Sequence, residues 1–289
     1  PHDKIYGLLG LISDLNKDDL SPRYDISVER LFLEVVVWFL KQYDSLSILG
    51  QCFSGYSRNL LPMPSWVPHW EPKDEGDEGP SPFHWEKYED LSTSKVLEPY
   101  SASGNLPLSS CSWSVNEETG MLCLTGAQLG TLTFLSEPAR LSYSMPQEYS
   151  FELAKRWLAL DKEFGGIYRF TRESTNLALR RTLVGDFLSN SIPSKDVIKK
   201  KQRNFMLMLP DDPILEIGGA QWDYKDSFIP FMTVVNKRRI ALSSEGWLGL
   251  VPENAMVGEK VVVLIGAPML HIVRDMQEIR PDCSSNCNV

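Results

Sequence analysis

Residues 239–273 read RIALSSEGWLGLVPENAMVGEKVVVLIGAPMLHIV and form the most strongly β-patterned stretch of the chain. Short apolar runs rich in β-branched residues alternate here with turn signals that contain glycine or proline. This spacing predicts consecutive short strands that build a small curled sheet or a partly closed barrel. The expected strands cover residues 239–242, 246–252, 260–265 and 269–273, within a small β unit that spans 228–274.

Upstream of this unit, residues 121–227 predict a mixed region of strands and helices. Alternation of apolar and polar residues among glycines and threonines over 121–136 indicates two short strands of a central sheet. The apolar spacing then becomes helical over 146–164 and again over 175–188, which indicates two amphipathic helices. Both helices have enough apolar surface on one side to pack on a shared core.

The N-terminal region, residues 1–70, is expected to be mainly helical. Ser27 stands at an N-cap position and Glu29 in the following turn suits the helix dipole, so a helix is predicted from there to about Lys41. Apolar residues cover most of its circumference and leave only a narrow polar stripe. We therefore expect this helix to be a central and largely buried element.

Two further segments have a composition that does not suit a packed core. Residues 71–120 begin with the acidic, breaker-rich run EPKDEGDEGPSP and are predicted to form an acidic and polar linker. Residues 275–289 lose all periodicity and are predicted to form a disordered tail. The predicted fold class is therefore α+β, with helical N-terminal and middle portions, a short central sheet and the C-terminal small β-barrel-like unit.

The overall composition is that of an intracellular globular protein. The five cysteines are an odd, scattered set that does not form a secreted disulfide framework. The longest dense apolar run, Leu31 to Leu40, is far shorter than the roughly 20 residues of a membrane-spanning helix. We predict a soluble, cytoplasmic protein without a membrane span. The chain enters an apolar stretch almost directly after Pro1, so we expect it to start inside a longer protein.

Two basic clusters, residues 199–203 and 237–239, raise the alternative of a weak nucleic-acid binder. The net charge of −9 gives no general attraction to phosphate, and neither cluster has interleaved aromatic residues for base stacking. Solvated turns or strand ends explain both clusters better. Nucleic acid is therefore not an expected partner.

The sequence contains no recognisable catalytic, cofactor or metal motif. Gly-x-Ser-x-Gly, a P-loop and His-Glu-x-x-His do not occur, so neither the strained serine corner, the phosphate cradle nor the paired zinc ligands of these motifs are available. Cys283 and Cys287 form a C-x3-C pair, but two thiols alone do not complete a tetrahedral zinc site. We predict no catalytic residue, cofactor or metal in this segment.

An enzyme with an unrecognised pocket stays open as an alternative. The triplet His-Trp-Glu occurs twice, at 69–71 and 84–86. The carboxylates Asp161 and Asp186 lie near the ends of the two predicted helices and are candidates for buried carboxylates. A histidine and a glutamate act as an acid/base pair only where both converge in one pocket, whereas near neighbours in an extended loop point apart. Tryptophan anchoring, helix caps and surface positions are the simpler interpretation of these residues.

Several blocks, in order along the chain, resemble fungal heterokaryon-incompatibility (HET) proteins. The opening PHDKIYGLLGL at 1–11 is similar to the D-P-R-D-K-I-Y-A-L-L-G-L segment that closes the HET domain. PSWVPHW at 64–70 resembles the family's L-P-S-W-V-P-D-W, and RTLVGD at 181–186 resembles its R-T-L-x-G-D helix. Residues 238–273 resemble the family's terminal block with its repeated glycines. Shorter matches lie at 27–30, 46–49, 102–104 and 122–126.

The resemblance implies a region C-terminal to the core of the HET domain, because the family's S-Y-x-W-G and W-I-D-x-x-C-I-x-Q blocks do not occur. It implies a non-catalytic regulatory or interaction portion of a protein of self/non-self recognition and programmed cell death. The implied partner is the protein's own HET domain, with other incompatibility proteins as further candidates. Arg30 departs from the family, which often has the glutamate of a capping box there. The motif residues, expected to be structural, are Asp3, Lys4, Tyr6, Gly10, Trp66, Pro68, Trp70, Gly185, Asp186, Gly246, Gly249, Pro252, Gly258 and Gly266.

Overall fold

The computed structural model describes residues 2–9, 20–52, 63–68, 70, 100–141, 147–183, 185, 231 and 234–275 of the 289-residue chain. Helices and strands both occur in these ranges, so the predicted α+β class is confirmed. The helical elements are α1 (His2–Leu9), α2 (Val28–Tyr43), η1 (Ser47–Gln51), η3 (Leu108–Ser110), α3 (Gln147–Leu158), η4 (Ala159–Lys162) and α4 (Thr175–Leu183). The strands are β1 (Ser114–Asn116), β2 (Met121–Cys123), β3 (Gly126–Leu135), β4 (Arg238–Ser243), β5 (Leu248–Pro252), β6 (Lys260–Leu264) and β7 (His271–Val273).

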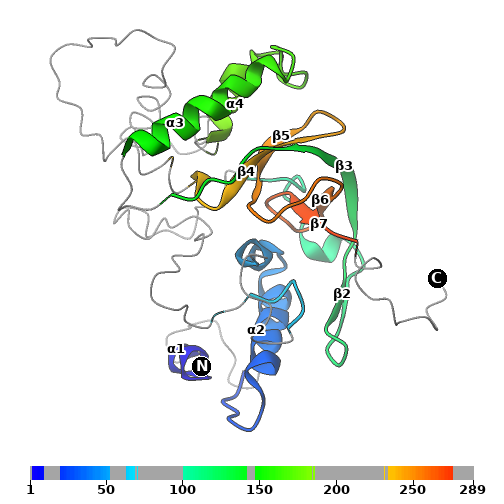
Figure 1. Cartoon of the computed structure of the whole chain (residues 1–289). Helices are drawn as coiled ribbons and strands as arrows, with labels where there is room; N and C mark the ends of the chain where they lie inside the picture. Colours follow the sequence, from blue (N-terminus) through cyan, green and yellow to red (C-terminus); the bar gives the residue numbers. More distant parts are fainter. Residues whose placement is uncertain are drawn as a thin grey trace, which may run out of the picture.

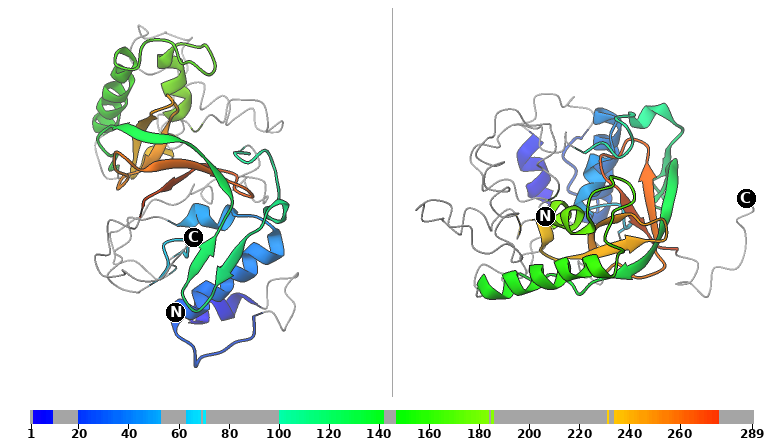
Figure 2. Two further views of the ribbon diagram at one scale, coloured as in Figure 1. Left: turned by 90° about the vertical axis from the view of Figure 1, so that its right-hand side faces the viewer. Right: turned by 90° about the horizontal axis from the view of Figure 1, so that it is seen from above.

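An antiparallel five-stranded sheet in the order β5-β4-β3-β6-β7 forms the middle of the molecule (Figure 1). The long strand β3 has register shifts at Gln128/Gly130 and at Leu132/Phe134. Such bulges bend a strand and increase its local twist, so the sheet curls. Figure 2 shows β3 arching from the side of α3 and α4 to the β1–β2 hairpin beside α2. The curl encloses a small core that includes Leu132, Val251 and Val261.

The four C-terminal strands agree with the prediction, but they are not a separate unit. The sequence pattern placed the strands of 121–136 in a different region from the β unit of 228–274. In the structure, β3 pairs with β4 through Leu132↔Ser243 and with β6 through Gly126↔Leu264. Strand β3 is thus the central strand of the same sheet. Pairing between strands more than a hundred residues apart leaves no periodic signal in either strand, which is why the pattern missed it.

The linker prediction for 71–120 is wrong over its described part, residues 100–120. This part contains η3 and β1, and Leu108 is fully buried. The segment is polar because the β1–β2 hairpin exposes one side, as the half-exposed alternation of both strands indicates. Residues 71–99 lie outside the described residues, as do residues 276–289, so the acidic loop and most of the predicted tail stay predictions.

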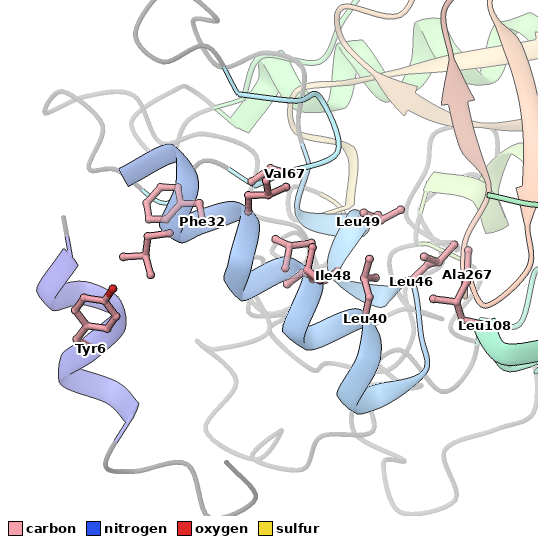
Figure 3. Packing of buried hydrophobic residues seen from close by; sticks show 13 residues of the cluster. Tyr6, Phe32, Leu40, Leu46, Ile48, Leu49, Val67, Leu108 and Ala267 are labelled. Atoms are coloured by element: carbon pink, nitrogen blue, oxygen red, sulfur yellow. The ribbon is translucent and has the colours of Figure 1, made fainter. Parts of the chain in front are cut away.

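The predicted central helix is confirmed as α2. The Ser27 hydroxyl accepts a hydrogen bond from the Arg30 amide at 3.3 Å, which satisfies one free donor of the first turn. The helix buries Leu31, Phe32, Leu33, Val36, Val37 and Leu40. With η1, Val67, Leu108 and Ala267 these side chains form a core between α2 and the end of the sheet (Figure 3).

A tight turn after β6 joins this helical core to the sheet. The amide of Leu46 donates to the carbonyl of Gly266 at 2.8 Å, and the amide of Leu108 donates to the carbonyl of Asp44 at 2.9 Å. Gly266 has φ +85°, and a Cβ there would lie 3.0 Å from the Cα of Leu108. The three segments therefore approach more closely than any residue with a side chain permits at position 266.

The predicted helices of 146–164 and 175–188 correspond to α3 with η4 and to α4, on the opposite side of the sheet from α2 (Figure 1). They share a second core with β4 and β5, to which Trp157, Leu179 and Ile240 contribute fully buried side chains. The hydroxyl of Ser174 accepts a hydrogen bond from the Leu177 amide and caps α4. No helix within the described ranges combines the length and apolar character that crossing a bilayer requires.

Candidate interaction site

Helix α1 is amphipathic and lies on the segment 20–26 that leads into α2. His2, Ile5, Tyr6 and Leu9 point inward, and of these Tyr6 is buried while Ile5 and Leu9 pack on the α2 core. Positions two, five, six and nine form one face of a helix, because they are spaced three or four residues apart. An eight-residue helix is not stable alone in water, so α1 owes its structure to this contact.

Three side-chain hydrogen bonds attach α1 to residues 23–26. His2 Nε2 lies 2.9 Å from the carbonyl oxygen of Ile26, and since a carbonyl only accepts, this nitrogen carries the proton. The Tyr6 hydroxyl donates to the carbonyl of Arg23 at 2.9 Å. The Tyr24 hydroxyl donates to Asp3 Oδ1 at 2.7 Å, and this hydrogen bond raises the pKa of Tyr24.

The rings of His2, Tyr6 and Tyr24 form a compact aromatic group around these hydrogen bonds. Their centroids lie 5.3–6.0 Å apart, and Tyr6 meets Tyr24 edge to face. Such pairs contribute about 0.5–1.5 kcal/mol beyond their buried area. The contact of α1 with the segment 20–26 therefore has a specific geometry.

A chain of alternating charges continues from this segment along the polar stripe of α2. Arg23 pairs with Glu34, Arg30 donates to Glu34 at 2.8 Å, and Arg30 also reaches Glu117 Oε2 at 2.5 Å. Burial by itself raises the pKa of Glu34, but the bonds from both arginines outweigh it and leave that pKa below its ordinary value. These ion pairs connect the segment 20–26, α2 and the β1–β2 hairpin.

This network gives Arg30 a structural role at the position where the HET motif often has a glutamate. The family glutamate at this position would reach back to the N-cap amide, whereas the longer arginine side chain reaches across to Glu117 and its carbonyl oxygen, the latter at 3.0 Å. Arg30 and Glu34 lie on the narrow polar stripe predicted for this helix. Their i, i+4 spacing was a usable signal for an ion pair, but nothing local indicated Glu117.

The tryptophans of the motif at 64–70 pack against the same core. Trp66 Nε1 donates to the carbonyl of Gly120 at 2.9 Å, and Pro68 is buried. Trp70 packs edge to face on Phe32 with centroids 5.1 Å apart, and its Nε1 donates to Gln51 at 3.2 Å. Both indoles combine a partly buried apolar ring with a satisfied N–H group, as expected for a structural role.

The glycine-rich motif residues of the second half lie in turns and strands. Gly185, Gly246, Gly258 and Gly266 all have positive φ, as sharp turns require. The carbonyl of Gly185 accepts a hydrogen bond from the Tyr100 hydroxyl, Gly249 pairs with Ala241 and Pro252 pairs with Arg238. Gly10 and Asp186 lie outside the described residues.

Of the two basic clusters, the structure describes residues 237–239, and the arginines of this cluster hydrogen-bond to the backbone. Burial lowers the pKa of Arg238 to about 10, and its guanidinium donates to the carbonyl of Val234 at 2.6 Å. Arg239 donates to the carbonyl of Ser136 at 2.5 Å. Both guanidinium groups hydrogen-bond to backbone carbonyls at the start of β4, which agrees with the interpretation of this cluster as a strand end. Residues 199–203 lie outside the described residues.

Little of the alternative enzymatic set falls within the described residues. Trp70 packs on Phe32 of α2, whereas Asp161 lies in η4, which directly follows α3. Histidine 69, residues 84–86 and Asp186 are outside the described ranges, as are Cys283 and Cys287. Within those ranges no group of three or more His, Cys, Asp or Glu side chains is arranged to hold a metal ion.

The outward face of α1 is the remaining feature of the site. Asp3, Lys4, Gly7 and Leu8 are exposed, and Leu8 keeps 55% of its surface accessible. A Cβ at Gly7 would meet no atom within 4 Å, so the backbone at Gly7 is uncovered. This face therefore presents the apolar side chain of Leu8 beside the uncovered backbone of Gly7 and the charged side chain of Lys4.

In comparisons with known proteins, no family model, no curated protein and no solved structure matches this chain. The resemblance to the HET family stays a prediction based on the motifs quoted above.

Proposed function

We propose that this chain is the non-catalytic regulatory or interaction portion of a heterokaryon-incompatibility protein. In this role it acts in the cytoplasm, in fungal self/non-self recognition and programmed cell death. The partner is the protein's own HET domain. Helix α1 is the observation that carries the proposal, because one of its faces is anchored to the body while the other is exposed around Leu8.

The motif residues of α1 divide between these two faces in a way that supports the proposal. Tyr6 faces the body and donates to Arg23, and Asp3 accepts from Tyr24, so both hold the helix in place. Lys4 belongs to the same motif but is exposed. A motif that only stabilised this body would have no use for its outward residue. The resemblance implies that the core of the HET domain precedes this helix and that α1 belongs to the end of the HET region.

The remaining motif residues support a scaffold rather than a reaction. Trp66, Trp70 and Gly266 sit at contacts where an indole N–H finds a carbonyl or side-chain oxygen, or where two backbones meet closely. The thiol of Cys52 donates to the carbonyl of Trp66 at 3.0 Å, and burial raises the pKa of this thiol to about 12. A thiol with such a pKa stays protonated at neutral pH and is a poor nucleophile.

The test is binding of the full chain to the matching HET domain, measured by calorimetry. We expect association, and we expect Leu8→Glu to weaken it by about tenfold or more, because a central apolar contact becomes a buried charge. Leu177→Glu is the matched control, since Leu177 is 39% exposed on α4 on the far side of the sheet. No association at high micromolar concentration, or equal losses for both variants, would contradict the proposal.

A further inference from the structure

The segment 20–26 contains a feature that the proposed function does not use. Leu20 is buried at 8% exposure and anchors its start, while residues 21–25 are all exposed. Ser21 is followed directly by Pro22, within a stretch that has neither helix nor strand. A serine followed by proline is the minimal acceptor of proline-directed protein kinases, which bind their substrates as irregular, accessible chain.

The residues next to Ser21 are those that hold α1. Arg23 contributes its carbonyl to Tyr6 and its guanidinium to Glu34 on α2, and Tyr24 donates to Asp3 on α1. Any shift of residues 23 and 24 therefore changes the hydrogen bonds that hold α1 in place. Arg23 keeps 48% of its side chain exposed, so a new anion has access to it.

We propose that Ser21 is a phosphorylation site for a proline-directed kinase, and that the phosphate draws Arg23 away from Glu34 and loosens α1. The serine Oγ attacks the γ-phosphorus of ATP, and the new O–P bond forms as the bond to the β-phosphate oxygen breaks. ADP leaves, and the hydroxyl proton passes to the kinase's catalytic base. The inference concerns regulation of the site described above, so its consequence for the HET domain rests on the proposed function.

The charges around the segment favour this exchange of partners. A phosphoserine carries about −1.5 to −2 charge and several strong acceptor oxygens at neutral pH, so it competes well with one carboxylate. Glu34 keeps an ion-pair partner when Arg23 leaves it, because Arg30 donates to Glu34 at 2.8 Å. Ser21 and Arg23 are separated by at most about 7 Å of extended backbone, which the arginine side chain spans.

Like-charge repulsion acts in the same direction. Among the described residues, the acidic groups near the segment are Asp3 on α1, Glu34 on α2 and Asp25 within the segment itself. A dianion at position 21 adds to this negative charge. Asp3 lies on α1, which side-chain hydrogen bonds attach to residues 23–26. Repulsion therefore opposes the Tyr24–Asp3 contact and the seating of α1.

The experiment uses the full chain, a proline-directed serine/threonine kinase and Mg-ATP, followed by mass spectrometry and hydrogen exchange. We expect phosphate on Ser21, none there in Ser21→Ala or Pro22→Ala, and unchanged labelling of Ser21 in Ser81→Ala, which removes the second Ser-Pro dipeptide of the chain. Exchange of residues 2–9 should become about tenfold faster after phosphorylation, while α2 serves as the internal reference and stays unchanged.

Three results would overturn the inference. Phosphate absent from Ser21 removes the site, and phosphate on Ser21 without faster exchange of residues 2–9 removes its effect on α1. Equal acceleration in α1 and α2 indicates general destabilisation instead of release. None of these measurements involves the HET domain, so their failure is distinguishable from failure of the binding experiment.

Discussion

Replacing Gly266 by alanine tests how the helical core is joined to the sheet. Gly266 has φ +85°, and a Cβ there would lie 3.0 Å from the Cα and Cβ of Leu108 and 3.1 Å from its nitrogen. The left-handed backbone costs an ordinary residue about 1–2 kcal/mol. Overpacking against the fully buried Leu108 adds about 1–3 kcal/mol, because the neighbour is backbone and cannot move aside cheaply. The expected loss is therefore about 2–5 kcal/mol in the free energy of unfolding.

Gly258→Ala is the matched control for this substitution. Gly258 has φ +95°, but a Cβ there would meet no atom within 4 Å. It should lose only the backbone contribution of about 1–2 kcal/mol. Urea unfolding monitored by tryptophan fluorescence measures both free energies from the midpoint and the slope. Equal losses for the two variants would refute the close packing of the turn 265–268 against η3 as a source of stability.

Three further predictions concern single side chains. Tyr24→Phe removes one exposed hydrogen bond to Asp3, so it should speed hydrogen exchange of α1 severalfold and change the free energy of unfolding by no more than about 1 kcal/mol. Unchanged exchange of α1 would contradict the anchoring role of Tyr24. Burial lowers the pKa of His271, whose Nδ1 has no hydrogen-bond partner among the described residues, so stability should be full above pH ~6.5 and fall as the pH decreases below that value. His271→Leu should flatten this dependence in urea midpoints measured at several pH values, and an identical slope would reject the assignment. Cys123 is exposed, whereas burial raises the pKa of the Cys52 thiol to about 12. Mass spectrometry after brief alkylation at pH ~8 should therefore find Cys123 modified and Cys52 intact. Equal labelling of both thiols would contradict the burial of Cys52.

Local patterns in the sequence predicted the individual elements well. The helix beginning at Ser27 was expected to reach about Lys41 and ends at Tyr43. The strands of 238–273 were expected within one or two residues of their positions. In each case the information lies in neighbouring residues: an N-cap hydroxyl, a helical apolar period or a turn glycine acts over at most a few positions.

The candidate site was only partly predictable. Asp3 and Tyr6 were identified by their motif, but their partners Tyr24 and Arg23 were not, because contacts across about twenty residues have no periodic signature. Glu117 was placed in a linker, although it ends the charge chain that starts at Arg23. Such pairings depend on how α1, α2 and the hairpin are arranged around a common core.

The amino-acid sequence by itself determined the type and the position of most helices and strands, because these follow from short-range steric and hydrogen-bond preferences. Only the tertiary structure decided that β3 lies between β4 and β6, that the turn at Gly266 closes on Leu108, and that α1 rests on residues 20–26. These choices depend on which apolar faces bury one another and which distant charges meet. That balance is a property of the whole packed chain and not of any one segment.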